Sequence, residues 1–481
     1  MSTTLDSLLR ANPELNIPVH NYNINVTSNL GDIVAATDVL EMYSDYAGRT
    51  EASHVYFHIP LCNYICHYCN YVKRKVSEKV GPAELRMWAE LLLAEMRAYR
   101  GRNSWLSLTP VSSMYIGGGT GALLLLDCNA LASLVNGFEE CFHVLPDCER
   151  TLEGNPENFT DESVSLALKL GFNRFSVGIQ SLQDKVNSFT NRGHDSREAL
   201  RAINVLVKTN LPFSVDMMFG LPFQTPDTVE DDIRALVDLK VPTISLYRLR
   251  NAEREKMGIG NASVWNVPIN RVRLDSKGLL PDVLETYRMR DRITRVLREH
   301  DYAPSPCGWW NRPGTYPDGN IPRVSRDKWQ RYSNMFAFGP GAYGWLTGRG
   351  TEVIQTHNVT DIAQYVKHMQ ATPDLPPLSH GRHLFGLNAI GTRLSFAFKA
   401  NQPICISEYK TRFGVRLLED EPYASVFAAL LAKGLMQSTM DGKALTSTAD
   451  GEELHEEIMF HYFHQAIGSS TLAQCQRTAT A

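Results

Sequence analysis

The sequence lacks the features that direct a chain to a membrane or to nucleic acid. Its 481 residues contain no run of about 18 consecutive apolar residues, which a membrane-spanning helix requires. The N-terminus lacks the basic and apolar regions of a secretory signal peptide. With 48 Lys and Arg against 52 Asp and Glu, the chain also lacks the positive charge typical of nucleic-acid binding. We therefore expect a cytoplasmic protein with neither a membrane nor a nucleic-acid partner.

A complete disulfide framework is also missing. The chain has nine cysteines, an odd number, and its length corresponds to roughly three domains or one large domain with additions, enough to bury a core without disulfides. Six cysteines are scattered singly, and we expect most of them to be small core residues. The other three, Cys62, Cys66 and Cys69, fall within eight positions.

Short apolar segments alternate with helical patterns over the first half of the chain. This alternation indicates βαβ units and a parallel sheet of curved or barrel-like form. The predicted strands are Val55–Pro60, Val111–Ile116, Arg150–Glu153, Arg174–Ile179, Phe213–Phe219 and Thr243–Leu249. The predicted helices between them are Pro82–Tyr99, Thr160–Leu170, Ser196–Thr209 and Thr225–Leu239. Ligands of such folds bind at the carboxyl ends of the strands, so residues there are the candidates for function.

The remainder of the chain is less regular. We expect an N-terminal extension over 1–50 with a helix near Ile33–Tyr46, and the barrel over 51–300. A connecting segment over 301–375, with a loop at Pro304–Pro322, is expected to close the active site. A small, mainly helical C-terminal domain is expected over 376–470, with helices around Val426–Lys433 and Gly451–His464, before a disordered tail over 471–481.

The cysteine cluster directly follows the first predicted strand, at the ligand-binding end of the sheet. Three thiolates with the spacing C-x₃-C-x₂-C can converge on one metal centre. A structural zinc site normally takes four protein ligands, so His58 or His67 would have to complete it. An iron–sulfur cluster held by three cysteines would leave one iron free for another ligand. The spacing favours iron–sulfur, while zinc and a chance arrangement stay open as alternatives.

The segments at the other strand ends extend this motif into a family resemblance. The chain resembles radical S-adenosylmethionine (SAM) enzymes and, more narrowly, the oxygen-independent coproporphyrinogen III oxidase-like family. The matching segments are Tyr56–Pro60, Gly117–Thr120, Glu153–Pro156, Phe172–Gln180, Asn191-Arg192 and Asp216–Pro222. The resemblance spans residues 55–345 and implies a partial (β/α)6 barrel with a [4Fe–4S] cluster on Cys62, Cys66 and Cys69. It further implies reductive cleavage of SAM to a 5′-deoxyadenosyl radical, a small-molecule substrate, and an electron donor of the flavodoxin or ferredoxin type.

The same resemblance implies roles for individual residues. Tyr56 would lie near the SAM sulfonium and Glu153 would bind SAM from a strand end; these two are the catalytic candidates. Tyr68 would pack near the adenine. The residues expected to bind the amino-acid part or ribose of SAM are Gly118, Gly119, Thr120, Gln180, Arg192 and Asp216. The family can hold a second SAM, and the matching positions are Met218, Gln330 and Tyr343.

Two departures from the family pattern bear on the reaction. Tyr71 stands where the coproporphyrinogen enzymes carry a further cysteine, and Gly121 stands where they carry proline. We therefore favour the class C methyltransferase and cyclopropanase type, in which a second SAM donates a methyl or methylene group to an sp² carbon of an aromatic or heteroaromatic substrate. The alternative is oxidative decarboxylation of coproporphyrinogen III or another radical reaction on a tetrapyrrole.

Two further points concern the possible roles of basic residues and a function without catalysis. A tetracarboxylate substrate would need cations, which Arg248, Arg250 and Arg254 could supply. The basic run Lys73–Lys75 is expected at the surface, where it could dock an acidic electron donor. The third hypothesis is a non-catalytic carrier that binds heme or another ligand; the intact cysteine motif argues against it.

Overall fold

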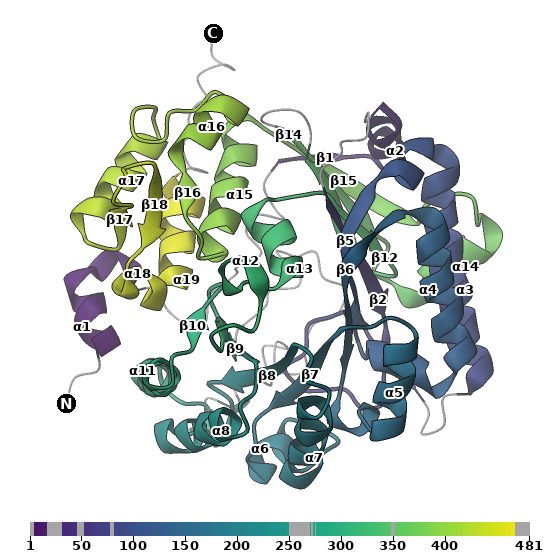
Figure 1. Cartoon of the computed structure of the whole chain (residues 1–481), viewed down its shortest axis with the longest axis horizontal. Coiled ribbons are helices and arrows are strands. Elements are labelled where there is room, and N and C mark those ends of the chain that lie inside the picture. The colour runs from purple at the N-terminus through teal and green to yellow at the C-terminus, as the bar shows by residue number, and fades with distance from the viewer. Residues whose placement is uncertain are drawn as a thin grey trace.

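One curved sheet organises the chain. The computed structural model describes residues 4–16, 31–45, 52–76, 81–249, 270, 273–274, 276–347 and 352–466. Thirteen strands form the sheet, in the order β1-β15-β14-β13-β12-β2-β5-β6-β7-β8-β9-β11-β10. Figure 1 shows the sheet curving around the middle of the molecule, with helices on its outer side and the C-terminal region across from it.

Six consecutive parallel strands form the centre of this sheet. They are β2 (Ser53–Ile59), β5 (Pro110–Gly118), β6 (His143–Gly154), β7 (Arg174–Gln180), β8 (Phe213–Phe219) and β9 (Thr243–Arg248). The predicted partial (β/α)6 barrel is therefore confirmed. The largest difference between the predicted and observed strands concerns β6. It begins at His143 and is longer than the predicted strand Arg150–Glu153.

Helices cover the outer face of the parallel strands (Figure 1). They are α3 (Pro82–Arg102), α4 (Cys128–Cys141), α5 (Asp161–Lys169), α7 (Ser196–Val207), α8 (Pro226–Asp238) and α11 (Val283–Glu299), together with the short α6 (Asp184–Phe189). Thr160 and Thr225 cap α5 and α8 by accepting backbone N–H groups, as their positions before helical patterns suggest. Sequence reasoning assigned no helix to Cys128–Cys141, although Asp127 caps it in the same way.

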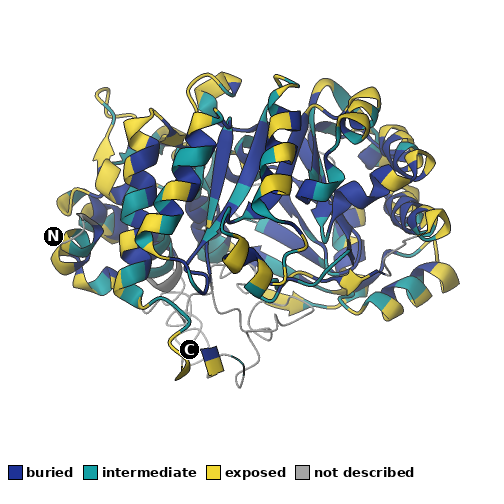
Figure 2. Cartoon of the chain, turned by 90° about the horizontal axis from the view of Figure 1, so that it is seen from below, coloured by how far each residue is buried: buried dark blue, intermediate teal, exposed yellow. Residues whose placement is uncertain are grey.

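The core lies between this helical layer and the sheet. Phe175, Val177 and Ile179 point to one face of β7 and are all 0% exposed, while Arg174 and Ser176 of the other face are 1% and 2% exposed, as expected for a parallel strand covered on both faces. Figure 2 shows the strands almost entirely buried, while the exposed residues lie on the outer surfaces of the helices.

Beyond β2 the sheet continues with strands from the second half of the chain. β12 (Met335–Phe338) is parallel to β2, and antiparallel strands follow: β13 (Tyr343–Thr347), β14 (Glu352–Asn358), β15 (Leu378–Phe385) and β1 (Asp32–Val34). The sheet thus extends past the boundary expected between 375 and 376 and takes in a strand from the N-terminal extension. The predicted helix near Ile33–Tyr46 is the shorter α2 (Ala36–Asp45), preceded by β1.

The C-terminal region is mainly helical, as predicted, with a small added sheet. Its helices are α15 (Gly386–Lys399), α16 (Ile406–Phe413), α17 (Tyr423–Ala432), α18 (Ala449–Glu453) and α19 (His455–Ile458). Three short strands, β16 (Ile404–Cys405), β18 (Ala444–Ser447) and β17 (Met436–Ser438), form the sheet. The N-terminal helix α1 (Thr4–Ala11) joins this region, because Leu5 and Leu9 are buried in its hydrophobic cluster.

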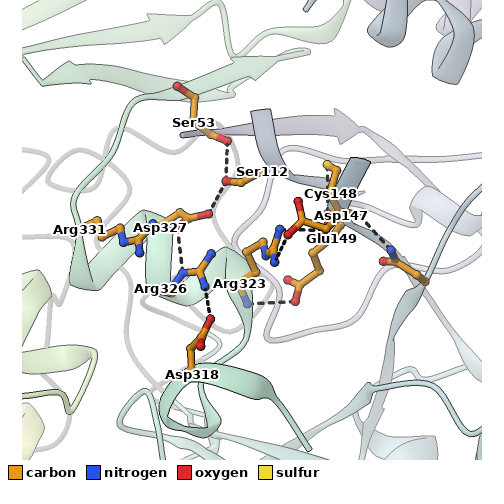
Figure 3. Close-up of polar contacts among 11 residues, drawn as sticks. Ser53, Ser112, Asp147, Cys148, Glu149, Asp318, Arg323, Arg326, Asp327 and Arg331 are labelled. Carbon is orange, nitrogen blue, oxygen red and sulfur yellow. Dashed lines mark hydrogen bonds and ion pairs between the residues drawn. The ribbon is translucent and has the colours of Figure 1, made fainter. Parts of the chain in front are cut away.

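A closing segment, Arg323–Gln330, covers the end of the barrel where the parallel strands begin (Figure 3). Asp327 is 0% exposed and contacts the hydroxyl of Ser112 at the start of β5. The backbone N–H groups of Arg323 and Val324 donate to Glu149 of β6, each at 3.0 Å. This part of the connecting segment therefore lies opposite the cysteine loop rather than over it.

The stretch before the closing segment was expected to be a loop, and this expectation was partly wrong. Pro304–Pro322 contains β11 (Trp309–Asn311), which pairs antiparallel with β9 and with β10 (Ala303–Pro304). The Asn311 side chain is fully buried and donates to the Asn320 carbonyl at 3.0 Å. A segment rich in Pro, Gly and Trp thus has an ordered backbone because strand pairing and buried side-chain bonds hold it.

A buried carboxyl ties α3 to the turn that leads from β12 to β13. Glu95 is 0% exposed and accepts hydrogen bonds from Gly339 N (2.8 Å), Asn358 Nδ2 (2.6 Å) and the Tyr365 hydroxyl (2.6 Å). Burial raises the pKa of Glu95 to about 7, although the three donors act in the opposite direction. A Cβ at Gly339 would lie 2.4 Å from the His58 carbonyl oxygen, so the turn packs closely against β2.

The raised pKa of Glu95 predicts a loss of stability with rising pH. A carboxyl that is easier to protonate in the folded state contributes fully below its unfolded pKa, and this contribution disappears as pH rises through the folded pKa. When the pH is raised from about 5 to about 8, the free energy of unfolding should therefore fall further in the wild type than in Glu95→Gln. The difference should reach up to roughly 3 kcal/mol. Urea unfolding at both pH values measures the difference. Glu90→Gln, at an exposed position of the same helix, is the control; an equal effect there would contradict the assignment.

Candidate active site

The cysteine loop is closed on itself at the carboxyl end of β2. Two short parallel strands, β3 (Leu61–Cys62) and β4 (Arg74–Lys75), pair the two ends of the loop. Within the loop, Cys69 N donates to the Cys66 carbonyl at 3.2 Å. Cys62 and Cys66 are each 8% exposed, and Cys69 is partly buried. The loop therefore brings three thiols together beneath a small exposed surface.

The three thiols also interact electrostatically. Burial raises the pKa of Cys62 to about 12, and the neighbouring Cys69 and Cys66 raise it further. Burial likewise raises the pKa of Cys69, while the Lys73 ammonium lowers it. Because metal ligands must be deprotonated thiolates, a bound metal would have to displace these protons.

Lys73 belongs to this loop and not to the surface. It is 9% exposed, and its Nζ donates to the carbonyls of Cys69 (2.7 Å) and Tyr71 (3.1 Å). The expectation that the whole run Lys73–Lys75 lies at the surface is therefore wrong for its first residue. Arg74 and Lys75 are exposed.

The histidines that a zinc site would need are engaged elsewhere. The ring nitrogens of His58 share hydrogen bonds with the Tyr56 hydroxyl (3.1 Å) and the Val72 carbonyl (2.7 Å). His67 Nδ1 lies 3.0 Å from the Phe189 carbonyl. Within the described ranges, no three His, Cys, Asp or Glu side chains, the three thiols of the loop included, are close enough together to hold a single metal ion. A cluster in which each thiol binds a different iron does not require such a tight group. Three soft sulfur donors without a histidine fit an iron–sulfur cluster better than zinc.

Glycines at the end of β5 allow this strand to approach the cysteine loop. Gly119 N donates to the Ile59 carbonyl at 2.8 Å. A Cβ at Gly119 would lie 2.7 Å from the carbonyl oxygens of Ile59 and Leu61 and 3.0 Å from Cys62 Sγ. Gly118 has a φ of +102°, and Thr120 accepts a hydrogen bond from Asn155 Nδ2 at 3.2 Å. The three residues expected to bind SAM, Gly118 to Thr120, therefore lie directly beside the cysteines.

Arg192 joins the cysteine loop to the ends of β6 and β7. Its guanidinium contacts Cys66 Sγ at 3.3 Å and donates to Asn155 Oδ1 at 3.1 Å and to the Gly178 carbonyl. It also lies over the Tyr64 ring, 5.3 Å from the centroid. Gln180 ends β7 with a φ of +72°, which is unusual for a residue other than glycine. Sequence reasoning gave no role to Asn155 or Tyr64, which hold Arg192.

Two carboxyl groups face the barrel interior. Burial raises the pKa of Glu153 to about 7, with the nearby Asp216 as the second cause. Burial raises the pKa of Asp216 to about 6 against the lowering effect of the Ser245 and Ser176 hydroxyls. Glu153 Oε2 also lies 3.4 Å from Gly118 N, within the same group as the glycine turn. Burial thus favours the neutral form of both carboxyls, and a cationic ligand such as a sulfonium or ammonium would favour their ionised form.

Tyrosine side chains surround these carboxyls. Tyr56 lies with its ring centroid 6.1 Å from that of Tyr115, and it packs in the same cluster as Tyr343. Tyr71 is 59% exposed and Tyr247 39% exposed. In addition to burial, the charge of Glu153 raises the pKa of the Tyr71 hydroxyl, and that of Asp216 raises the pKa of the Tyr247 hydroxyl. Both rings therefore lie near the two carboxyls with part of their surface exposed. Sequence reasoning missed Tyr115 and Tyr247, since a tyrosine in a strand has no distinguishing pattern.

The remaining predicted site residues are not all gathered here. Tyr68 and Met218 pack in one apolar cluster with Leu221. Gln330 is the last residue of the closing segment. It lines a cavity whose other wall is formed by residues of the C-terminal region. No contact places it beside Tyr343 or Met218 among the residues the structure describes.

Of the three arginines expected to bind substrate carboxylates, only Arg248 lies among the described residues. Arg248 has a side chain only 1% exposed, 3.0 Å from Glu456 and 3.8 Å from Glu457. It joins β9 to α19, so its expected role as a substrate cation is wrong: the side chain points into the interface with the C-terminal region. Arg250 and Arg254 lie outside the described residues.

The chain is similar to known proteins over the region that contains this site. The family description "Radical SAM superfamily" matches residues 56–236. The heme chaperone HemW of Lactococcus lactis is 25% identical over 315 residues, covering 65% of this chain and 73% of that protein. Anaerobilin synthase of Escherichia coli O157:H7 is 31% identical over 205 residues, covering 42% and 44%.

A solved structure extends the similarity to the whole fold. Coproporphyrinogen III oxidase (HemN) of Escherichia coli superimposes with a TM-score of 0.71 at 18% identity, over 90% of this chain and 94% of that one. At this identity the similarity concerns the fold. In the described part of the chain, no helix combines the length and apolarity that crossing a membrane demands.

Proposed function

Because the chain belongs to the radical SAM superfamily, we propose that it is an enzyme that cleaves SAM reductively and acts on a tetrapyrrole. The observation that carries the proposal is the convergence of Cys62, Cys66 and Cys69 with Gly119 and Arg192 at one end of the barrel. Each of these contacts joins a different strand end to the cysteine loop.

The protein side of the mechanism follows from these positions. Cys62, Cys66 and Cys69 would hold three irons of a [4Fe–4S] cluster, which supplies the electron that cleaves SAM to methionine and a 5′-deoxyadenosyl radical. The turn Gly118–Thr120 and Arg192 would orient the carboxylate and amino group of SAM. Glu153 and Asp216 would bind its cationic part, and Tyr56 would lie along its path to the substrate. An electron donor of the flavodoxin or ferredoxin type would dock outside the cysteine loop.

The substrate class is supported by the walls of the site and by the relatives. The partly exposed rings of Tyr71 and Tyr247 lie near the two carboxyls, and aromatic rings pack well against a flat conjugated macrocycle. The names of the relatives refer to heme and to anaerobilin, a bilin, and both are tetrapyrroles. The aromatic or heteroaromatic substrate inferred from the sequence is therefore proposed to be a tetrapyrrole.

For the reaction, we propose methyl or methylene transfer from a second SAM to an sp² carbon of the macrocycle. Tyr343, one of the expected second-SAM residues, packs with Tyr56 on the inner face of the sheet. Met218 lies in the cluster that contains Tyr68. These two positions support a second binding place next to the first, while Gln330 does not contribute to it.

A single set of incubations tests the proposal. The protein is reconstituted anaerobically with iron and sulfide, reduced, and given methyl-deuterated SAM with heme or coproporphyrinogen III. Deuterium in 5′-deoxyadenosine supports abstraction from the methyl group of a second SAM. Release of CO₂ from coproporphyrinogen without that deuterium would replace methyl transfer by decarboxylation. Absence of 5′-deoxyadenosine under every condition would overturn the enzymatic proposal.

The HemW relatives make a heme chaperone the second candidate. Heme that binds stoichiometrically, without 5′-deoxyadenosine formation, and that passes to an apo-hemoprotein would support it. The two candidates are thus separated by one product and one transfer assay.

A further inference from the structure

We propose that a cavity between the closing segment and α16 binds a small molecule that carries a carboxylate or phosphate group. The cavity has a volume of about 360 Å³, within the range typical of small-molecule sites. Its walls come from Asp318 to Tyr332 on one side and from α15, β16 and α16 on the other. Four of its lining residues are arginines: Arg326, Arg331, Arg393 and Arg412.

The charges of the wall favour an anion. Two carboxylates, Asp318 and Glu408, line the cavity with the four guanidinium groups. Arg326 pairs with Asp318 at 3.0 Å and with the buried Asp327 behind the wall at 3.2 Å. Arg412 lies 3.5 Å from Glu408. Arg331 lies 3.5 Å from Asp327. Among the described residues, four guanidinium groups thus stand against three carboxylates when Asp327 is included, and an oxyanion would suit this balance.

Arg393 supplies a guanidinium that is already held in place. The residue is 3% exposed, and its guanidinium carbon lies 5.2 Å from the Tyr332 ring centroid and 4.8 Å from that of Phe413. Contact with two aromatic rings holds the planar group in place, and its Nη2 donates to the Glu352 carbonyl at 3.4 Å. A fixed guanidinium binds carboxylate or phosphate in a bidentate manner with little loss of side-chain entropy.

This cavity is separate from the site at the cysteine loop. Its wall contains none of the cysteines, the glycine turn, Glu153 or Asp216. Arg326 and Asp327 belong to the network at the opposite end of the barrel, where Asp327 meets Ser112 (Figure 3). Gln330, expected to contact a second SAM, lines the cavity as well. Because SAM carries a carboxylate, it has to be tested as a competing ligand.

Titration of the full chain with inorganic phosphate, and separately with succinate, tests the proposal at fixed ionic strength. We expect saturable heat of binding for at least one of them. Arg412→Met and Arg331→Met should each weaken binding by about tenfold or more, since each removes a charge-assisted contact. Arg416→Met is the matched control, because Arg416 follows α16, pairs with Asp420 at 2.7 Å and is half exposed.

Arg331 is the decisive position, because its side chain is 54% exposed and its loss should not unfold the chain. Arg393→Met is expected to abolish binding, with circular dichroism to confirm that α15 is retained. Binding of phosphate alone identifies a phosphate ligand, and binding of succinate alone identifies a carboxylate; either supports the proposal. Displacement of the bound ion by SAM would support the proposal and identify SAM as a carboxylate ligand of the cavity. No binding of either ion, or an equal loss in Arg416→Met, would overturn it.

Cys405 offers an independent readout. It lines the same cavity, and hydrogen bonds from Ser407 and the backbone at the start of α16 lower its pKa. Alkylation of Cys405 by iodoacetamide, followed by peptide mass spectrometry, should slow when phosphate or succinate saturates the cavity. An unchanged alkylation rate at saturating ion would place the bound ion elsewhere and contradict the proposal.

Discussion

Cys66→Ala is expected to remove both the iron–sulfur cluster and every trace of 5′-deoxyadenosine formation. The substitution removes one of the three protein ligands of the cluster. It also removes the sulfur atom that the Arg192 guanidinium contacts at 3.3 Å. Stability should change little, by about 1 kcal/mol, because the substitution deletes a single buried sulfur atom. Iron and sulfide analysis after anaerobic reconstitution measures the first effect, and chromatography of the reaction mixture measures the second.

The other two ligand positions should behave alike, and one cysteine away from the loop should not. Cys62→Ala and Cys69→Ala are expected to give the same loss, since each thiol would bind its own iron. Cys128→Ala is the control, because Cys128 is exposed at the first position of α4. Full iron content and turnover in Cys66→Ala would mean that the motif is not the cluster site. Equal loss in Cys128→Ala would point instead to general damage by cysteine replacement.

Local patterns in the sequence were sufficient for the parallel half of the fold. β8 was predicted with its observed ends, Phe213–Phe219, because a run of apolar residues is bounded by Pro212 and Gly220. The helices predicted over Thr160–Leu170 and Thr225–Leu239 extend only one residue beyond α5 and α8 at each end. The cysteine loop and the glycine turn were found in the same way, since each lies directly after a strand. Because the strands are parallel, segments that follow them lie at the same end of the sheet.

Features that depend on distant pairing were not visible. β1 joins the main sheet only by pairing with β15, which lies more than 300 residues later in the chain. Arg248 carries the positive charge that could bind a substrate carboxylate. It pairs instead with two glutamates of α19, more than 200 residues away in sequence. Gln330 matched a family position, yet the closing segment carries it to the other end of the barrel. Charge and motif identify candidates, whereas tertiary contacts decide which of them meet.

Gly119→Ala is expected to lose the cluster while the protein stays folded. The added Cβ would lie 2.7 Å from the carbonyl oxygens of Ile59 and Leu61, closer than Cβ atoms come to other atoms in real structures. Both obstacles are backbone atoms, so the start of the cysteine loop or the glycine turn must move. Cys62 Sγ, at 3.0 Å, would move with it. Overpacking of this kind costs about 1–3 kcal/mol, which a chain with such a large core can absorb.

The effect of Gly119→Ala should be steric. It should not come from backbone strain, which arises when alanine replaces a glycine with positive φ. Gly119 is not among the glycines with positive φ, so alanine can adopt its backbone conformation. Gly101→Ala is the matched control: it lies in α3 with nothing within 4 Å of the added Cβ, and it should stabilise the helix by about 0.5–1 kcal/mol. Iron content, SAM binding and thermal unfolding are compared for both variants. If Gly119→Ala kept normal iron content and SAM cleavage, the close approach of β5 to Cys62 would not be required for the cluster. A low iron content with an intact unfolding transition would instead show that this approach sets the position of the first thiolate.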